Sequence, residues 1–152
     1  MSDWPPQYDD TYLPPNDQEY WFPELETESP EARIERVLEK LQGQMAWAYE
    51  RSPFYKRVWD AAGILPSDMR TLDDFHRVPI ITKEDLREDL IENPPFGSNI
   101  CDDWADIERI HGSSGTTGIP TVLTISRDDW KRIGNAHARV MWGAGIRPTD
   151  MV

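Results

Sequence analysis

The stretch Arg109-Ile-His-Gly-Ser-Ser-Gly-Thr-Thr-Gly-Ile-Pro-Thr121 decides the fold of this chain. Six consecutive small residues, Gly112 to Thr117, are followed by Gly118 and lie between two short apolar runs. Glycine lets a backbone curl, so that its N–H groups and the neighbouring hydroxyls can surround one anion. The stretch therefore predicts a strand, a phosphate-binding loop and a second strand.

The flanks of the loop favour strands and exclude the common nucleotide loops. Residues 107–110 are a short run of apolar and charged side chains, and residues 121–125 are rich in β-branched ones. The loop lacks the Gly-Lys-Ser/Thr of a Walker A loop and the Gly-x-Gly-x-x-Gly of a Rossmann turn. It leads into a strand, so no helix dipole is expected to help. Binding would rely on hydroxyls and on amides freed by Gly115 and Gly118, which suits a polyphosphate.

A helical segment is expected before the loop. Ser29-Pro30 is typical of a helix start, and apolar residues at helical spacing predict a helix over 30–51. Shorter helices are predicted from Ser52 to Gly63, near 72–77 and near 83–91. After the second strand, Ser126 to Asp129 has the pattern of another helix start, and Gly143 or Gly145 would end that helix.

Composition limits the class of protein. The chain has 152 residues, enough for one domain, and its formal charge of −12 argues against nucleic-acid and anionic-membrane partners. Of 28 acidic residues, nine lie within residues 1–32, which contain no Lys or Arg. Residues 1–19 are also rich in proline and predict an acidic disordered arm. No secretion signal or membrane-length apolar run is present, which predicts a cytoplasmic protein.

The single cysteine and the three histidines do not indicate a catalytic or metal site. Cys101 is the only cysteine, which excludes an internal disulfide and a thiolate metal cluster. Acidic residues follow it and would not lower its pKa. His111 could orient a nucleotide or the loop, although a histidine at a strand end is more often structural. His76 and His137 receive no role, and no metal ligands are assigned.

At the loop the sequence resembles a known family. Ser113-Ser-Gly-Thr-Thr-Gly-x-Pro120 is similar to the signature loop of the acyl-adenylate-forming enzymes, also called AMP-dependent synthetases and ligases. From about Tyr20 onward, further stretches resemble the N-terminal part of one branch, the phenylacetate–CoA ligases. They are Tyr20-Trp-Phe-Pro, Ser52-Pro-Phe-Tyr-Lys-Arg57, Ala61-Ala-Gly63, Pro79-Ile-Ile-Thr-Lys83, Pro95-Phe-Gly97, Arg109-Ile-His111 and Gly145-Ile-Arg-Pro148.

This resemblance implies an ATP-dependent acid–CoA ligase. In the family, a carboxylate attacks the α-phosphate of ATP to give an acyl-adenylate and pyrophosphate, and the thiol of coenzyme A then displaces AMP. The implied cofactors are ATP, Mg²⁺ and coenzyme A, and the implied substrate is an aromatic carboxylic acid. Fixed donors would stabilise the charge on the departing pyrophosphate. The residues carried over as these donors are Ser113, Ser114, Gly115, Thr116, Thr117 and Gly118.

Two departures from the family pattern narrow this interpretation. Ile119 and Thr121 stand where related loops commonly carry a lysine, which should weaken ATP binding unless a distant Lys or Arg substitutes. Family members are also much longer, and their metal ligand, ribose-binding aspartate, carboxylate pocket and late lysine lie beyond Val152. No catalytic residue is therefore assigned, and the chain alone is expected to be inactive and to need a missing C-terminal part or a partner chain.

The expected fold is α/β, as a truncated part of the large N-terminal domain of an adenylate-forming enzyme. It would comprise a helical segment over 20–92, a loop over 93–106, and a strand, phosphate loop, strand and helix over 107–152. Two alternatives remain: a non-catalytic module that binds a nucleotide or a partner chain, and one half of a split enzyme. A homodimer of the full-length form and a carrier-protein acceptor also stay open.

Overall fold

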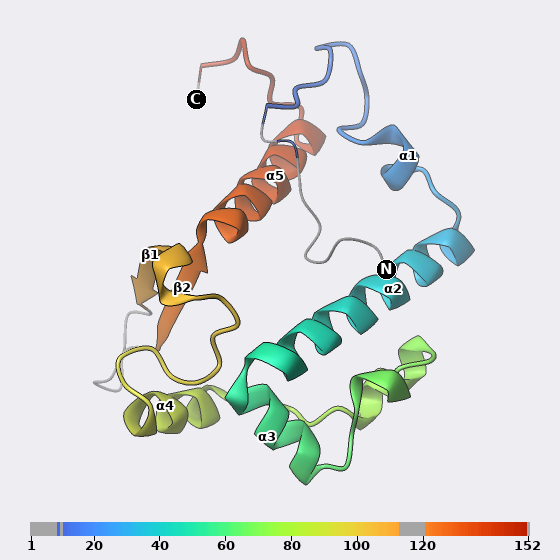
Figure 1. Ribbon diagram of the computed structural model, residues 1–152. Coiled ribbons are helices and arrows are strands. Elements are labelled where there is room, and N and C mark those ends of the chain that lie inside the picture. The colour runs from blue at the N-terminus through green and yellow to red at the C-terminus, as the bar shows by residue number, and fades with distance from the viewer. Residues whose placement is uncertain (1–8, 10, 113–120, 152) are drawn as a thin grey trace.

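The computed structural model describes residue 9, residues 11–112 and residues 121–151. Within these ranges the strands form one two-stranded sheet and helices make up most of the rest (Figure 1). The elements are α1 (Pro23–Glu26), α2 (Pro30–Arg51), α3 (Pro53–Ala61), η1 (Pro66–Asp68), η2 (Leu72–Arg77), α4 (Lys83–Glu92), η3 (Trp104–Asp106), β1 (Ile107–Gly112), β2 (Val122–Ser126) and α5 (Arg127–Gly143). The mixed helix–strand class expected from the sequence is confirmed. None of the described helices is long and apolar enough to cross a membrane.

The helix boundaries follow from local capping. The Ser29 side chain accepts a hydrogen bond from the Ala32 amide and starts α2 at Pro30, as predicted. Ser52 ends α2 and starts α3, because its side chain accepts from the Tyr55 amide. The predicted segment 72–77 is a 3₁₀ helix rather than an α-helix, started by the expected Thr71 and Asp74 pair.

The apolar core lies where the C-terminal half of α2 packs on α3 and η1. After α3, the chain turns at Gly63, whose φ of +66° favours glycine, and Ile64 then enters the core. The N-terminal half of α2 lies outside this core, since Ile34 and Val37 are largely exposed. The buried residues of the core are Met45, Ala48, Trp59, Ile64 and Met69.

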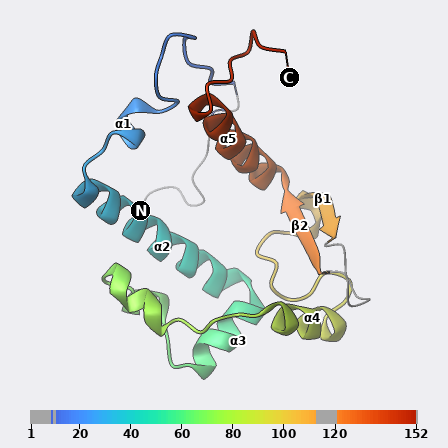
Figure 2. The same ribbon diagram turned by 180° about the vertical axis from the view of Figure 1, so that it is seen from behind.

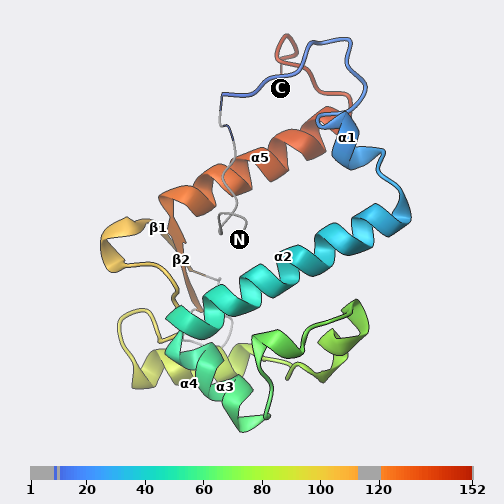
Figure 3. The ribbon, with the colours of Figure 1, turned by 45° about the vertical axis from the view of Figure 1, so that its right-hand side comes forward.

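A second packed cluster joins residues 12–22 to the C-terminal end of α5. Trp142 is buried there, and its ring meets the Trp21 ring edge to face at 5.5 Å. Its Nε1 donates to the Gln18 carbonyl at 3.1 Å. This contact connects α5 with the segment before α1, while α2 and α5 lie well apart along most of their length (Figures 2 and 3). The domain boundary expected after residue 19 stays a prediction.

Candidate functional site

The β1–β2 hairpin forms the base of the loop that the sequence singles out. The strands pair antiparallel, with Gly112 opposite Val122 and His111 opposite Leu123. The predicted phosphate-binding residues 113–118 lie between the strands in sequence and outside the described residues. The structure thus defines where the loop leaves β1 and where the chain enters β2. His111 is exposed beside the loop, and its orienting role stays a prediction.

A reciprocal helix cap forms the junction between β2 and α5. Ser126 is buried, and its Oγ accepts a hydrogen bond from the Asp129 amide at 3.2 Å. The Asp129 carboxylate accepts in return from the Ser126 amide and hydroxyl. This reciprocal cap, predicted from the sequence, satisfies donors at the helix start and fixes the direction in which α5 leaves the sheet.

Two side chains of β1 also reach α5. The Arg109 guanidinium carbon lies 3.9 Å from the centre of the Trp130 ring, which is a cation–π contact. The neighbouring Glu108 carboxylate lies 3.7 Å from Arg127 Nε in an exposed ion pair. Both strands of the hairpin are therefore tied to the same helix.

A buried carboxylate anchors the segment between α4 and η3. The Asp89 side chain is 1% exposed and accepts from the Ser98 amide at 2.6 Å and the Ser98 hydroxyl at 2.5 Å. It also accepts from Asn93 Nδ2 at 3.1 Å and from Arg57 at 3.2 Å. Burial alone would raise the pKa of Asp89, but the Ser98 donors and the Arg57 guanidinium outweigh it and leave the pKa below its usual value.

Gly97 allows this segment to close over Asp89. Its φ is +82°, and a Cβ there would lie 2.8 Å from oxygens of Asp89 and Asn99, so a larger residue does not fit. The Ser98 carbonyl accepts from the Ser52 hydroxyl at 3.0 Å, which attaches the segment to the start of α3. Sequence analysis missed this cluster; an acid within a helix, followed by a Pro-Phe-Gly-Ser turn, was the available signal.

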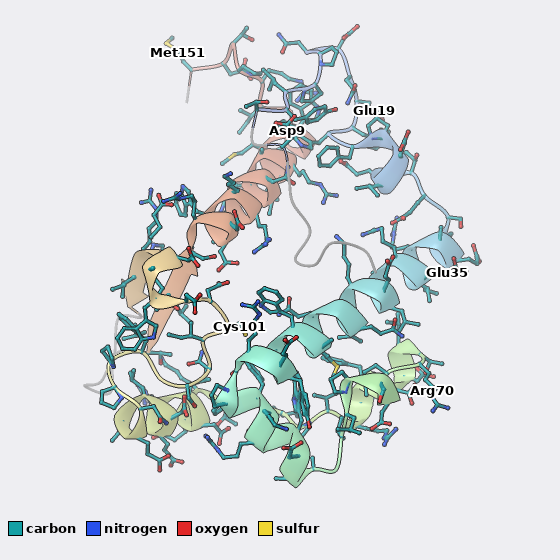
Figure 4. All side chains as sticks on the ribbon, viewed as in Figure 1. Asp9, Glu19, Glu35, Arg70, Cys101 and Met151 are labelled. Atoms are coloured by element: carbon teal, nitrogen blue, oxygen red, sulfur yellow. The ribbon has the colours of Figure 1, made fainter. Side chains whose placement is uncertain are left out.

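A cavity of about 260 Å³ separates this anchored segment from the hairpin. Figure 4 places Cys101 between the C-terminal part of α2 and the hairpin, where it borders the cavity. The lining includes side chains from α2, α3, β2 and α5 as well. These include Trp47, Tyr55, Leu123 and Arg132, and Phe96 of the anchored segment also lines the cavity.

Burial suppresses the ionisation of the Cys101 thiol. Burial, together with the nearby Asp102 carboxylate, raises the pKa of Cys101 to about 11. Burial, together with the Asp129 charge, also raises the pKa of Asp102. The thiol is therefore not activated as a nucleophile. In the described ranges, no group of three His, Cys, Asp or Glu side chains is arranged to hold a metal ion.

We expect Cys101 to react slowly with iodoacetamide in the native protein. At pH 8 a thiol of such high pKa is ionised roughly two-hundredfold less than an ordinary one of pKa about 8.5. Alkylation rates, followed by mass spectrometry with and without guanidinium chloride, test this. Equal rates in the two conditions would contradict the buried, neutral thiol.

Curated relatives match most of this chain. The phenylacetate–coenzyme A ligase of Thermus thermophilus is 40% identical over 130 residues, which cover 86% of this chain and 28% of that protein. The Escherichia coli protein of the same name is 38% identical over 128 residues, covering 84% and 28%. The chain belongs to the phenylacetate–CoA ligase family. It spans less than a third of the length of these relatives. No family model matches the chain.

Solved structures of one CoA ligase have the same fold as this chain over the matched region. A structure of 2-hydroxyisobutyryl-CoA ligase in complex with 2-HIB-AMP and CoA is 49% identical, with a TM-score of 0.92 over 97% of this chain and 31% of that one. An open conformation of the same ligase is 48% identical, with a TM-score of 0.89 over 95% and 33%. The chain thus has the fold of one part of an adenylate-forming ligase.

Proposed function

We propose that this chain supplies the ATP phosphate-binding loop of an acid–CoA ligase. The observation that carries the proposal is the loop sequence 113–118, closed at its base by the Gly112–Val122 pair of the hairpin. Hydroxyls and glycine-freed amides suit phosphate oxygens, because several donors can converge on one anion. The membership of the chain in a ligase family supports the same function.

The proposed reaction has two steps. An acid carboxylate attacks the α-phosphorus of ATP and pyrophosphate leaves, giving an acyl-adenylate. The sulfur of coenzyme A then attacks the acyl carbonyl, and AMP leaves. ATP, Mg²⁺ and coenzyme A are the cofactors of this proposal. The contribution of this chain would be to hold the β- and γ-phosphates while charge builds on the departing group.

The similar proteins suggest two classes of acid substrate. The curated relatives are phenylacetate–CoA ligases at 34–40% identity, which favours an aromatic acid. The solved structures, at 46–49% identity, are of a 2-hydroxyisobutyryl-CoA ligase, which favours a small 2-hydroxy acid. We propose an aromatic acid, with the 2-hydroxy acid as the second candidate. The remaining active-site groups would come from a C-terminal part or a partner chain in the cytoplasm.

A chimera tests this proposal. In the chimera, this chain replaces the aligned segment, about 31% of the length, of 2-hydroxyisobutyryl-CoA ligase. We expect acid-dependent exchange of labelled pyrophosphate into ATP with 2-hydroxyisobutyrate, because the acid pocket would come from the recipient. The matched control carries Thr116→Ala and Thr117→Ala, and we expect it to lose at least about tenfold in exchange rate.

The chimera also separates the alternatives. Exchange that depends on the loop threonines supports an ATP-binding role for the loop. A folded chimera without exchange, beside an active parent enzyme, would contradict that role and favour a non-catalytic module. Adding Ile119→Lys tests the missing cation: ATP affinity should rise, since a charge near the phosphates is restored.

A further inference from the structure

The hairpin contains a bulge at its base. Ile107 pairs with Ser126 and Arg109 pairs with Ile125, so β1 has one more residue than β2 between these pairs. The extra residue is Glu108. A bulge increases local twist and redirects the side chains that follow it. Beyond the bulge, Arg109 and His111 lie on one face of β1, because side chains alternate along a strand.

The first side chain after the bulge contacts α5. Arg109 lies 3.9 Å from the centre of the Trp130 ring, about one turn into that helix. Trp130 itself borders a second cavity, together with Tyr12 and Trp21 from the segment before α1. The Trp130 ring thus lies beside the hairpin on one side and the cavity near Tyr12 and Trp21 on the other, with 39% of the residue exposed.

A small rotation at the base of the hairpin would displace the end of β1. Gly112, where β1 ends, is three residues from Arg109, which corresponds to about 10 Å along a strand. Donors that stabilise charge on a phosphate must lie within a few tenths of an ångström of their productive positions. A contact that fixes the base of the hairpin therefore fixes the direction in which the chain leaves β1 at Gly112.

We propose that Arg109 and Trp130 act together as a positioning pair for the phosphate loop. The pair holds β1 against α5, and Arg109 acts through Trp130 rather than by contacting phosphate. This inference rests on the proposed function, because it assigns the loop an ATP-binding role. The competing assignment has Arg109 replacing the missing loop lysine as a direct phosphate ligand.

A ligand-free measurement tests the structural half of the proposal. Amide hydrogen exchange of residues 107–112 and 122–126 is compared in the whole chain, Arg109→Met, Trp130→Leu and Trp130→Phe. We expect about three- to fivefold faster exchange in Arg109→Met and Trp130→Leu, and a smaller change in Trp130→Phe, which keeps an aromatic ring. The matched control is Arg127→Met, which removes the exposed pair with Glu108 and should leave exchange unchanged.

Calorimetry with Mg²⁺ and ATP tests the functional half. We expect Arg109→Met, Trp130→Leu and the double variant to lose the same factor of affinity, about three- to fivefold, because each breaks one contact. A large loss in Arg109→Met beside an unchanged Trp130→Leu would overturn the proposal in favour of direct phosphate binding. Losses of affinity that add up in the double variant would also overturn the proposal, because they would show that the two residues act independently.

The remaining outcomes are equally decisive. Unchanged hairpin exchange in both single variants would overturn the positioning role. Faster exchange with unchanged ATP affinity would overturn its connection to the loop. An unmodified chain that binds no ATP would instead refute the proposed function and with it the functional half, while the exchange data would still decide whether the pair orients the hairpin.

Discussion

Replacing Asp89 with alanine is expected to lower the free energy of unfolding by about 3 to 5 kcal/mol. The carboxylate is 1% exposed and accepts both donors of Ser98, one from Asn93 and one from Arg57. Its removal leaves the amide and hydroxyl of Ser98 without their buried acceptor, and unsatisfied buried donors are costly. Chemical denaturation at neutral pH measures the change.

The adjacent residue provides the control for this prediction. Glu88 lies on the same helix but is exposed, so Glu88→Ala should change stability by less than about 0.5 kcal/mol. Asp89→Asn keeps the size of the side chain but places an amide donor against other donors, and we expect an intermediate loss. Similar unfolding midpoints for Asp89→Ala and Glu88→Ala would contradict the anchoring role.

The contribution of Asp89 to the free energy of unfolding should also depend on pH. Its pKa in the folded protein lies below the value of about 3.9 expected for an unfolded aspartate. A depressed folded pKa stabilises the protein above the unfolded pKa, and this stabilisation is lost as the pH falls through the folded pKa. The stability difference between the unmodified protein and Asp89→Asn should therefore be full near pH 6 and shrink below pH 4. A difference that stays constant down to about pH 2 would contradict this assignment.

Trp142→Ala should cause a loss of similar size, about 3 to 5 kcal/mol. Its ring is 3% exposed and packs against Trp21, its Nε1 donates to Gln18, and the Arg147 guanidinium stacks on it at 3.9 Å. These partners belong to both ends of the chain, so the substitution should also release residues 12–22 from α5. Thermal unfolding and limited proteolysis measure the two effects.

Two further variants sharpen this test. Trp142→Phe keeps an aromatic ring and loses the hydrogen bond to Gln18, so it should cost about 1 to 2 kcal/mol. Trp104→Ala removes a tryptophan of which 62% is exposed and should cost less than about 1 kcal/mol. Unchanged cleavage before α1 in Trp142→Ala would show that the cluster does not hold that segment.

The longer helices α2, α3, α4 and α5 were predictable because their determinants are local, whereas the short α1, η1 and η3 were not predicted. The caps at Ser29, Ser52 and Ser126 each involve an amide three residues away, so both partners can be recognised in one short window. The hairpin was predictable for the same reason, since its strands flank one loop. The 3₁₀ form of residues 72–77 was not, because capping patterns do not distinguish the two helix types.

The contacts between distant segments were not predictable. Asp89 lies on a helix whose other acids are solvated, and only the return of Ser98 over it explains its burial. Residue type alone does not separate the tryptophans, because Trp59 and Trp142 are buried, whereas Trp104 is largely exposed. Periodicity gives the apolar face of a helix but not the partner that covers it.

In the candidate site, too, the local sequence motif was predictable and the contact between distant residues was not. The sequence of residues 113–118 identifies the loop and its family by chemistry alone. The contact that ties its base to α5 joins Arg109 to Trp130, which are 21 positions apart on different elements. No short motif encodes that geometry, because it depends on the bulge in β1 and on the direction of α5.

Calorimetric titration of the 152-residue chain with ATP and Mg²⁺, beside pyrophosphate and AMP, tests the central claim most directly. Because the proposed loop binds the β- and γ-phosphates, which AMP lacks, we expect binding of ATP and pyrophosphate and much weaker binding of AMP. The variant with Thr116→Ala and Thr117→Ala should bind ATP at least about tenfold more weakly. A folded chain that gives no binding heat with ATP or pyrophosphate would contradict the claim that residues 113–118 form a phosphate-binding loop.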